Sequence, residues 1–432
     1  MEKINYKDSL VWKILLNLCA LILGVVFIFS GFVKAVDPLG TCYKIEDYIE
    51  AFGLAKVVPD FLPLMLSIAL CCLEFLIGIM LLLRVRRRIA TILVLLMMVV
   101  MTPLTFYLAL TNPISDCGCF GDALVLTNWQ TFYKNVVLLI GAIVVFIGYK
   151  QLTPILSFKK EWMVTSWSLV FILGIAFYGL YYLPLFDFRP YKIGVNIPQA
   201  MEIPEGAELS KYDTRFVLEK GGEKREFGLE DYPDSTWTFI ESKTVLVKQG
   251  FEPPIHDFSL MDLETGENMT SEVLDHNGYT FLLVAHRVEE ADESDIDLVN
   301  EVYDFCVEYG YHFYALTSSP EEEIMRWREQ TGAEYDFFLA DDITLKTIIR
   351  SNPGLLLLKD GTIFNKWSSR DLPDEFVMNG PLEEIEIGKQ KVVNAPMRLL
   401  MTFLVFCIPL SLLLGHDQFL SYLRRRKSKT DY

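Results

Sequence analysis

Apolar residues gather in long runs along the 432-residue chain. A membrane-spanning helix needs about 20 such residues in succession, and six runs are long enough: 11–33, 61–83, 89–110, 132–150, 162–184 and 396–415. The pattern predicts six transmembrane helices, and we expect Asn128 to cap the fourth. The first run is too long for a secretory signal and lacks a small-residue cleavage site, which favours an uncleaved anchor.

Basic residues indicate how these helices are threaded. They cluster before the first run, between the second and third, between the fourth and fifth, and after the sixth. Short basic loops stay in the cytoplasm, so both termini are predicted to be cytoplasmic in a bacterial inner membrane. The segments predicted to be periplasmic are residues 34–60, 111–131 and 185–395.

Composition strengthens the membrane interpretation and separates two regions by charge. Hydrophobic residues make up 52% of the chain, above the range of about 45–50% that is usual in soluble domains. Residues 185–395 hold 43 of the 56 acidic residues but only 19 of the 39 basic ones. An acidic surface disfavours a nucleic-acid partner. The partners that we expect are the lipid bilayer and an envelope protein client.

The long periplasmic region contains two patterns. Short alternating runs interrupted by turn residues predict a small β-meander in residues 185–250. Residues 251–378 alternate strand and helix patterns and end in a hairpin, which is typical of an α/β layer with mostly parallel strands. We therefore expect a multi-domain protein: a four-helix membrane domain (1–150), a fifth transmembrane helix (151–184), the β-rich segment (185–250), the α/β domain (251–378), and a linker with the sixth helix and a basic tail (379–432).

The segment Asp116-Cys117-Gly118-Cys119-Phe120-Gly121-Asp122, here called the cysteine loop, is the main candidate for chemistry. Two thiols one residue apart on an oxidising face are expected to form a strained, labile disulfide, which suits an exchange site. The flanking carboxylates of Asp116 and Asp122 are expected to oppose thiolate formation. Cys42, in a predicted interfacial helix at residues 41–55, offers a third, resolving thiol.

Three other interpretations of these cysteines stay open. Cys42 could form a structural bridge to Cys117 or Cys119, or the two loop thiols could be inert. A metal site is disfavoured, because no periplasmic His lies nearby in sequence and the neighbouring carboxylates suit harder ions than thiolates do.

Glu74 is an ionisable residue near the middle of the second apolar run. Such a group costs about 2.5–3.5 kcal/mol on insertion scales and normally faces the bundle interior. We consider two interpretations: a proton or quinone site, and a protonated carboxyl making one interhelical hydrogen bond. The neighbouring Cys71 and Cys72 are expected to be packing residues.

The α/β pattern, with Ser351-Asn352-Pro353-Gly354 just before an apolar strand, resembles the thioredoxin-like fold of membrane-anchored thiol reductases and peroxiredoxins over residues 251–370. The resemblance implies that Pro353 is a cis proline. Where that family has Cys-x-x-Cys, this chain has residues 286–292 without a thiol. Cys306, the only cysteine of the domain, is expected in the core. We therefore expect no dithiol exchange by this domain itself.

The membrane domain resembles the DoxX-like and MauE-like family over about residues 11–150. The resemblance rests on the segment from Ser30 to Lys34, on Glu74 and on the Cys-Gly-Cys-Phe-Gly sequence of the cysteine loop. MauE-like proteins are associated with maturation of methylamine dehydrogenase and with a thioredoxin-like partner, MauD. The resemblance implies an electron-transfer or disulfide-handling role.

These observations favour a redox protein that handles electrons or disulfides at Cys117 and Cys119 during envelope protein maturation, with Cys42 and Glu74 as further site residues. If the chain is an enzyme, we expect a thiol-disulfide or quinone-linked oxidoreductase. The alternative is a non-enzymatic assembly or binding protein that uses its acidic domain for docking. A transporter is disfavoured, because the helices show no inverted repeat.

Overall fold

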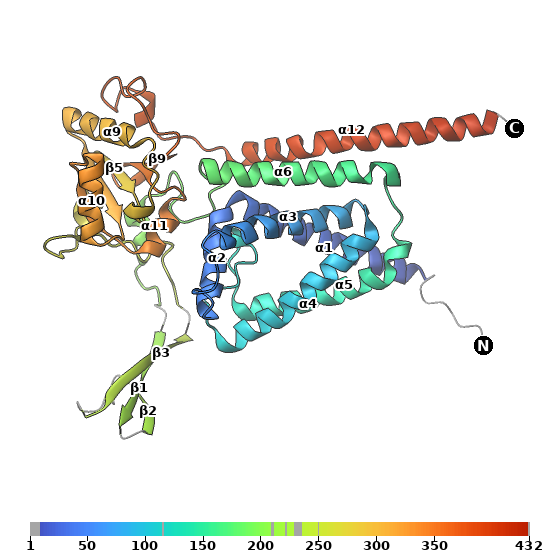
Figure 1. The fold of residues 1–432 in the computed structure, drawn as a ribbon, viewed down its shortest axis with the longest axis horizontal. Helices are drawn as coiled ribbons and strands as arrows, with labels where there is room; N and C mark the ends of the chain where they lie inside the picture. Colours follow the sequence, from blue (N-terminus) through green and yellow to red (C-terminus); the bar gives the residue numbers. More distant parts are fainter. Residues whose placement is uncertain are drawn as a thin grey trace.

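The computed structural model describes residues 9–114, 116–208, 211–220, 223–228, 236–248 and 250–430. Figure 1 shows a bundle of long helices with a mixed sheet and its helices at one end. The predicted helical membrane part is confirmed, since six helices of the described residues are long and apolar enough to cross a membrane. Helix α1 (Leu10–Val36) begins, and α12 (Ala395–Thr430) ends, at the end of the bundle far from the sheet.

The spanning helices lie close to the predicted runs. Between α1 and α12 they are α3 (Leu62–Leu82), α4 (Arg87–Thr111), α5 (Asn128–Gly148) and α6 (Glu161–Tyr181). The expectation that Asn128 caps α5 is wrong. Thr127 is the cap: its hydroxyl accepts from the Gln130 N–H at 3.3 Å, and the Gln130 side chain accepts from the Thr127 N–H at 3.0 Å. Two helix-terminal donors are satisfied by this exchange.

Helices α1 and α3 cross in direct backbone contact. A Cβ atom added at Gly31 would lie 2.4 Å from the backbone N of Phe75, and one added at Gly78 would lie 2.6 Å from the α1 backbone. No larger residue fits at either position without moving a helix. The crossing brings Lys34, one turn after Gly31, against Glu74, one turn before Gly78.

The predicted interfacial helix is present as α2 (Pro38–Ala51). Asp37 begins it, because its carboxylate accepts from the Gly40 N–H at 3.0 Å and Pro38 occupies the first helical position. Cys42 lies on the buried side of this helix. Figure 1 shows α2 at the end of the bundle that faces the mixed sheet.

The mixed sheet has six strands in the order β4-β7-β6-β5-β8-β9. The central strand β5 is buried at all six positions, and its alternate side chains face two separate apolar clusters. Strands β5, β6 and β7 are parallel, whereas β4, β8 and β9 pair antiparallel. The strands are β4 (Met261–Asp262), β5 (Tyr279–Val284), β6 (His312–Thr317), β7 (Asp336–Leu339), β8 (Gly354–Lys359) and β9 (Thr362–Ser368).

Short helices accompany this sheet: α7 (Ile197–Met201), α8 (Thr270–Leu274), α9 (Ile296–Tyr309), α10 (Glu321–Thr331) and α11 (Asp342–Ile348). We call strands β4 to β9 with helices α8 to α11 the α/β unit. Strand β4 is limited to two residues, since only Met261 and Asp262 pair with β7.

A second sheet contains β1 (Lys211–Lys220), β2 (Glu223–Phe227) and β3 (Thr238–Lys248) in the order β2-β1-β3. The simple meander that the sequence suggested is therefore wrong, because β1 lies in the middle and pairs with both neighbours. The two short runs expected within residues 236–247 are one continuous strand, β3. Strand β2 was missed because its sequence is mostly charged.

Candidate functional site

The cysteine loop connects α4 to α5 at the end of the bundle next to the α/β unit. The Sγ atoms of Cys117 and Cys119 lie 3.1 Å apart as hydrogen-bonded free thiols. Gly118 between them has φ +65°, which a residue with a Cβ rarely adopts. Its N–H donates to the Asp116 carboxylate at 2.8 Å. The turn at Gly118 thus places both thiols on the same side of the loop.

The two thiols differ in protonation. The hydrogen bond from Cys117 lowers the pKa of Cys119 to about 6, with Lys134 and Lys34 adding positive charge against the effect of burial. The same hydrogen bond and burial raise the pKa of Cys117. Cys117 is buried, whereas Cys119 is half-buried. Of the two thiols, Cys119 therefore loses its proton more readily.

Asp116 and Asp122 were expected to oppose thiolate formation, but each carboxylate is paired with a cation: Asp116 with Lys44 at 3.0 Å, and Asp122 with Arg350 at 3.1 Å. The charges that shift the pKa of Cys119 come instead from Lys134 of α5, Lys34 of α1 and Glu74 of α3.

Glu74 is not a lone carboxyl. Both of its carboxylate oxygens accept from Lys34 Nζ at 2.7 Å, and both side chains are about 5% exposed. Neither sequence interpretation of Glu74 included this ion pair. The signal was present in the sequence, since Lys34 ends an apolar run and a buried ammonium needs an anionic partner.

Ser30 connects this ion pair to the cysteine loop. Lys34 Nζ donates to the Ser30 hydroxyl at 3.0 Å, and that hydroxyl donates to the Cys119 carbonyl at 2.6 Å. The backbone of Cys119 is thereby held against α1. Sequence reasoning missed both Ser30 and Lys34 as site residues, although they lie one helical turn apart in the quoted segment.

Cys42 does not share these contacts. Its thiol donates to the Glu46 carboxylate at 3.4 Å. Burial, followed by the charge of Glu46, raises its pKa to about 12. All eight cysteines of the chain lie in the described part and are free thiols. The role of Cys42 as a resolving thiol stays a prediction.

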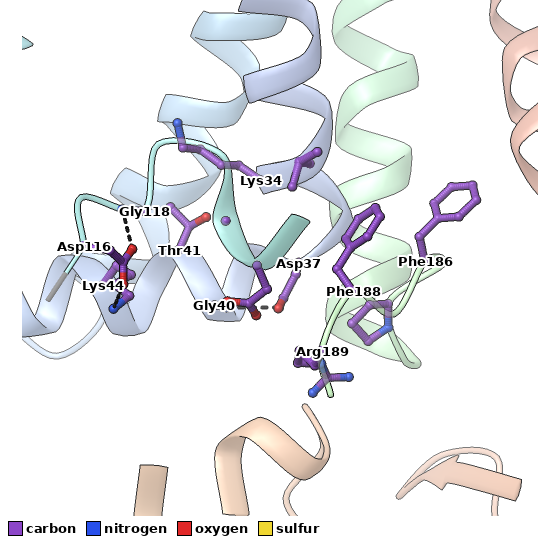
Figure 2. A pocket seen from close by; sticks show the side chains of 14 residues that line it. Lys34, Asp37, Gly40, Thr41, Lys44, Asp116, Gly118, Phe186, Phe188 and Arg189 are labelled. Carbon is purple, nitrogen blue, oxygen red and sulfur yellow. Dashed lines mark hydrogen bonds and ion pairs between the residues drawn. The ribbon is translucent and has the colours of Figure 1, made fainter. Parts of the chain in front are cut away.

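Two small cavities flank the cysteine loop. Figure 2 shows the outer one, where Lys44 reaches Asp116 and where Phe186, Phe188 and Arg189 approach from the segment that follows α6. Its volume is about 20 Å³, enough for a single water molecule. The outer side of the loop is therefore closely packed.

The inner cavity lies among helices α1, α3, α4 and α5 and has a volume of about 40 Å³. Ser30, Glu74, Cys119, Lys134 and Asn135 line its polar part. Cys119 and Glu74 thus border the same space. Methionine side chains of α4 form much of the apolar remainder.

The α/β unit contacts the cysteine loop through Arg350. This guanidinium binds Asp37 at 2.9 Å and Asp122 at 3.1 Å, and it lies over the ring of Tyr43. Its side chain is only 6% exposed. Burial opposes the charge, but Asp37 and Asp122 outweigh that effect and raise the pKa of Arg350. The membrane part and the α/β unit are therefore joined by a buried ionic contact.

The bond between Asn352 and Pro353 is cis, as predicted. Asn352 Nδ2 donates to the Arg287 carbonyl at 2.8 Å, which links the cis bond to the thiol-free segment 286–292. Cys306 lies in the core at 1% exposure, also as predicted, and burial raises its pKa. Segment 286–292 of the α/β unit contains His286 and charged neighbours and no thiol.

A cleft of about 900 Å³ separates segment 286–292 from helix α2. Polar and charged side chains from both sides line it, including Glu46 and Glu50 of α2 and Arg370 of the α/β unit. Its volume is in the range of ligand-binding clefts.

Comparisons with known proteins find similarities to separate parts of the chain. The family described as "Methylamine utilisation protein MauE" matches residues 12–148, which contain the cysteine loop. A domain of unknown function matches residues 212–249. No curated protein is similar enough to count as a match. Among solved structures, a thiol peroxidase from Chromobacterium violaceum is 16% identical, with a TM-score of 0.24, covering 30% of this chain and 84% of that one. The helical part is thus similar to MauE proteins.

Proposed function

We propose that this chain is a membrane thiol-disulfide exchange protein of MauE type in which Cys117 and Cys119 alternate between dithiol and disulfide. The observation that carries the proposal is the contact between two thiols at 3.1 Å whose pKa values are shifted in opposite directions. A thiolate beside a protonated thiol is the arrangement that exchange requires.

Each cysteine has a separate role in this proposal. The Cys119 thiolate attacks one sulfur of a disulfide in an envelope protein and forms a mixed disulfide, while the other sulfur leaves. Cys117 then attacks Cys119, closes the loop disulfide and releases the reduced partner. Two electrons pass from the loop to the partner, and the reverse sequence oxidises the partner.

The α/β unit is proposed to position the partner rather than to react with it. Its strand order and its cis Asn352-Pro353 bond support the resemblance to thioredoxin-like proteins. The absence of a thiol from segment 286–292 supports a role without dithiol chemistry. Arg350 couples the unit to the cysteine loop.

The proposed location is the bacterial inner membrane, with both termini in the cytoplasm and the α/β unit in the periplasm. This orientation is supported by the basic clusters of the sequence. It is also supported by the start of α1 and the end of α12, which lie together at the end of the bundle away from the cysteine loop.

A quinone does not fit next to Glu74. The cavity that Glu74 shares with Cys119 measures about 40 Å³, whereas ligand pockets usually measure about 300 Å³ or more. We therefore derive no step through a quinone, and a protein disulfide is the oxidant in our scheme.

The test compares two double variants of the full-length protein in lipid nanodiscs. Reaction of the reduced protein with 5,5′-dithiobis(2-nitrobenzoate) releases a coloured thiolate. We expect Cys117→Ser with Cys119→Ser to reduce the rate by about 100-fold or more, since the low-pKa thiolate is removed. Cys71→Ser with Cys72→Ser is the matched control, because this pair is buried in the membrane part, and it should keep the rate of the unmodified protein. Equal rates in both double variants would refute the proposal.

The cleft of about 900 Å³ favours a second candidate, a non-enzymatic binding protein. In that case envelope protein maturation in cells should survive the Cys117→Ser and Cys119→Ser changes. It should be lost when residues 185–395 are deleted. The exchange proposal predicts loss of maturation in both variants.

A further inference from the structure

The charged groups that act on Cys119 come from helices α1, α3 and α5 and from the loop itself, whereas α4 contributes only methionines to the cavity lining. Lys34 lies on α1, Glu74 on α3 and Lys134 on α5, while Cys117 completes the set within the loop. From α2, the Tyr48 hydroxyl donates to the Cys117 carbonyl at 3.3 Å. Among these groups, Glu74 is the only carboxylate that borders the same cavity as the Cys119 thiol.

Lys34 and Glu74 form an ion pair that is buried within the bundle. A buried ion pair is weak evidence for stability, because two well-packed apolar side chains often do as well. Ionisable residues within membrane helices more often mark proton or substrate pathways. The Ser30 hydroxyl connects this ion pair to the Cys119 backbone. This position favours a role of the pair in the chemistry of Cys119.

The inner cavity offers a route for a proton. Its volume of about 40 Å³ exceeds the 10–15 Å³ that one buried water molecule needs, roughly, together with two to four polar partners. The Glu74 carboxylate, the Ser30 hydroxyl and the Lys134 ammonium provide such partners on its lining. A water molecule there can receive a proton from Cys119 and donate one to Glu74.

We propose that Glu74 is the internal proton acceptor for Cys119, reached through the inner cavity, and that Lys34 is the positioning residue that holds the Glu74 carboxylate at this cavity. This inference rests on the proposed exchange function. In the forward direction the Cys119 thiol gives its proton to Glu74, and the sulfur electron pair forms the bond to the partner. Glu74 then releases this proton to water, so the two protons lost by the loop thiols balance the two taken up by the released thiolates of the partner. In the reverse direction Glu74 returns the proton to Cys119.

The loss of a negative charge and the loss of a proton acceptor should change the exchange rate of Glu74→Gln in opposite directions. The negative charge of Glu74 raises the pKa of Cys119, so its removal would by itself favour the thiolate and speed the reaction. Loss of the proton acceptor should slow it instead, since a positioned acid-base group contributes about 100-fold or more. A slower exchange reaction in Glu74→Gln would therefore indicate a catalytic proton acceptor, and a faster one would indicate a structural charge.

The experiment measures exchange of the full-length protein with 5,5′-dithiobis(2-nitrobenzoate) between pH 5 and 8 in lipid nanodiscs. We expect Glu74→Gln to be at least about tenfold slower than the unmodified protein below pH 6, where Cys119 must lose a proton. Glu74→Asp should recover part of the rate. Glu161→Gln is the matched control: it removes another buried carboxylate, at the start of α6, and should leave the rate unchanged.

Should Glu74→Gln not fold, the double variant Lys34→Gln with Glu74→Gln replaces the ion pair by two amides that can bond to each other, and it should be as slow. An unmodified protein no faster than the Cys117→Ser, Cys119→Ser variant would refute the exchange function and this inference together. An active unmodified protein whose Glu74 variants match or exceed its rate would refute the proton acceptor alone.

Discussion

The cysteine loop and segment 286–292 of the α/β unit differ in whether they contain thiols. The loop has two thiols in contact within a helical membrane part. Segment 286–292 lies beside a cis proline at the end of a buried parallel strand but has no thiol. In the loop, the positive charge near the thiolate comes from Lys34 and Lys134 on neighbouring helices. The lowered pKa of Cys119 therefore depends on the hydrogen bond from Cys117 and on charges from the bundle.

The largest contrast should appear between the thiols of the two regions. Cys119, with a pKa of about 6, should be alkylated by iodoacetamide at a rate that rises up to about pH 6 and then levels off. Cys306 is 1% exposed and has a raised pKa, so it should react at least about 100-fold more slowly until the protein unfolds. Mass spectrometry of the modified peptides measures both rates. Faster labelling of Cys117 than of Cys119 would reverse our assignment of the attacking sulfur.

Arg350→Ala should break the contact between the two regions. It leaves Asp37 and Asp122 facing each other without their cation, and breaking a buried ion pair costs about 3 kcal/mol. Amide hydrogen exchange of residues 116–122 should then rise by about 100-fold, since local opening becomes easier by that amount. Arg326→Ala is the control, because its ion pair with Glu323 is mostly exposed and contributes less than about 1 kcal/mol. Unchanged exchange in Arg350→Ala would mean that the regions are held together elsewhere.

A smaller effect is expected from His286, which lies where the α/β unit lacks a thiol. Burial, helped by the nearby Lys346, lowers its pKa to about 4 from an ordinary value of 6.5. Between these values the unfolded chain binds a proton that the folded chain does not, so stability is fully present above about pH 6.5 and falls as pH drops toward 4. The loss should be about 2–3 kcal/mol, measured as a lower urea midpoint by tryptophan fluorescence.

His286→Asn should flatten this pH dependence. His256→Gln is the matched control, because His256 is 62% exposed at its side chain and should leave the dependence as it is. If the stability of His286→Asn still depends steeply on pH, carboxylates of the acidic region cause this dependence instead of His286.

Features that depend on neighbouring residues were predicted well from the sequence. The spanning helices follow from the length of apolar runs, whereas the cis bond before Pro353 was implied by the resemblance to thioredoxin-like proteins. The ion pair was not predicted, because Lys34 and Glu74 are 40 residues apart and meet only through the crossing at Gly31. The lowered pKa of Cys119 was missed because it depends first on the geometry of the hydrogen bond from Cys117 and then on Lys134 and Lys34, which meet the loop only in the folded bundle. The sequence shows the negative charges of Asp116 and Asp122, but it does not show that Lys44 and Arg350 pair with them.

The close crossing of α1 and α3 also sets an order for biogenesis. Glu74 enters the membrane in α3, after α1 has been synthesised, and its carboxylate meets a cation only when Gly31 and Gly78 bring the two helices together. Until then the ammonium of Lys34 can stay at the membrane surface, whereas Glu74 must cross in its uncharged form or wait for its partner. A larger residue at Gly31 or Gly78 would therefore leave both charged side chains without their partner inside the membrane.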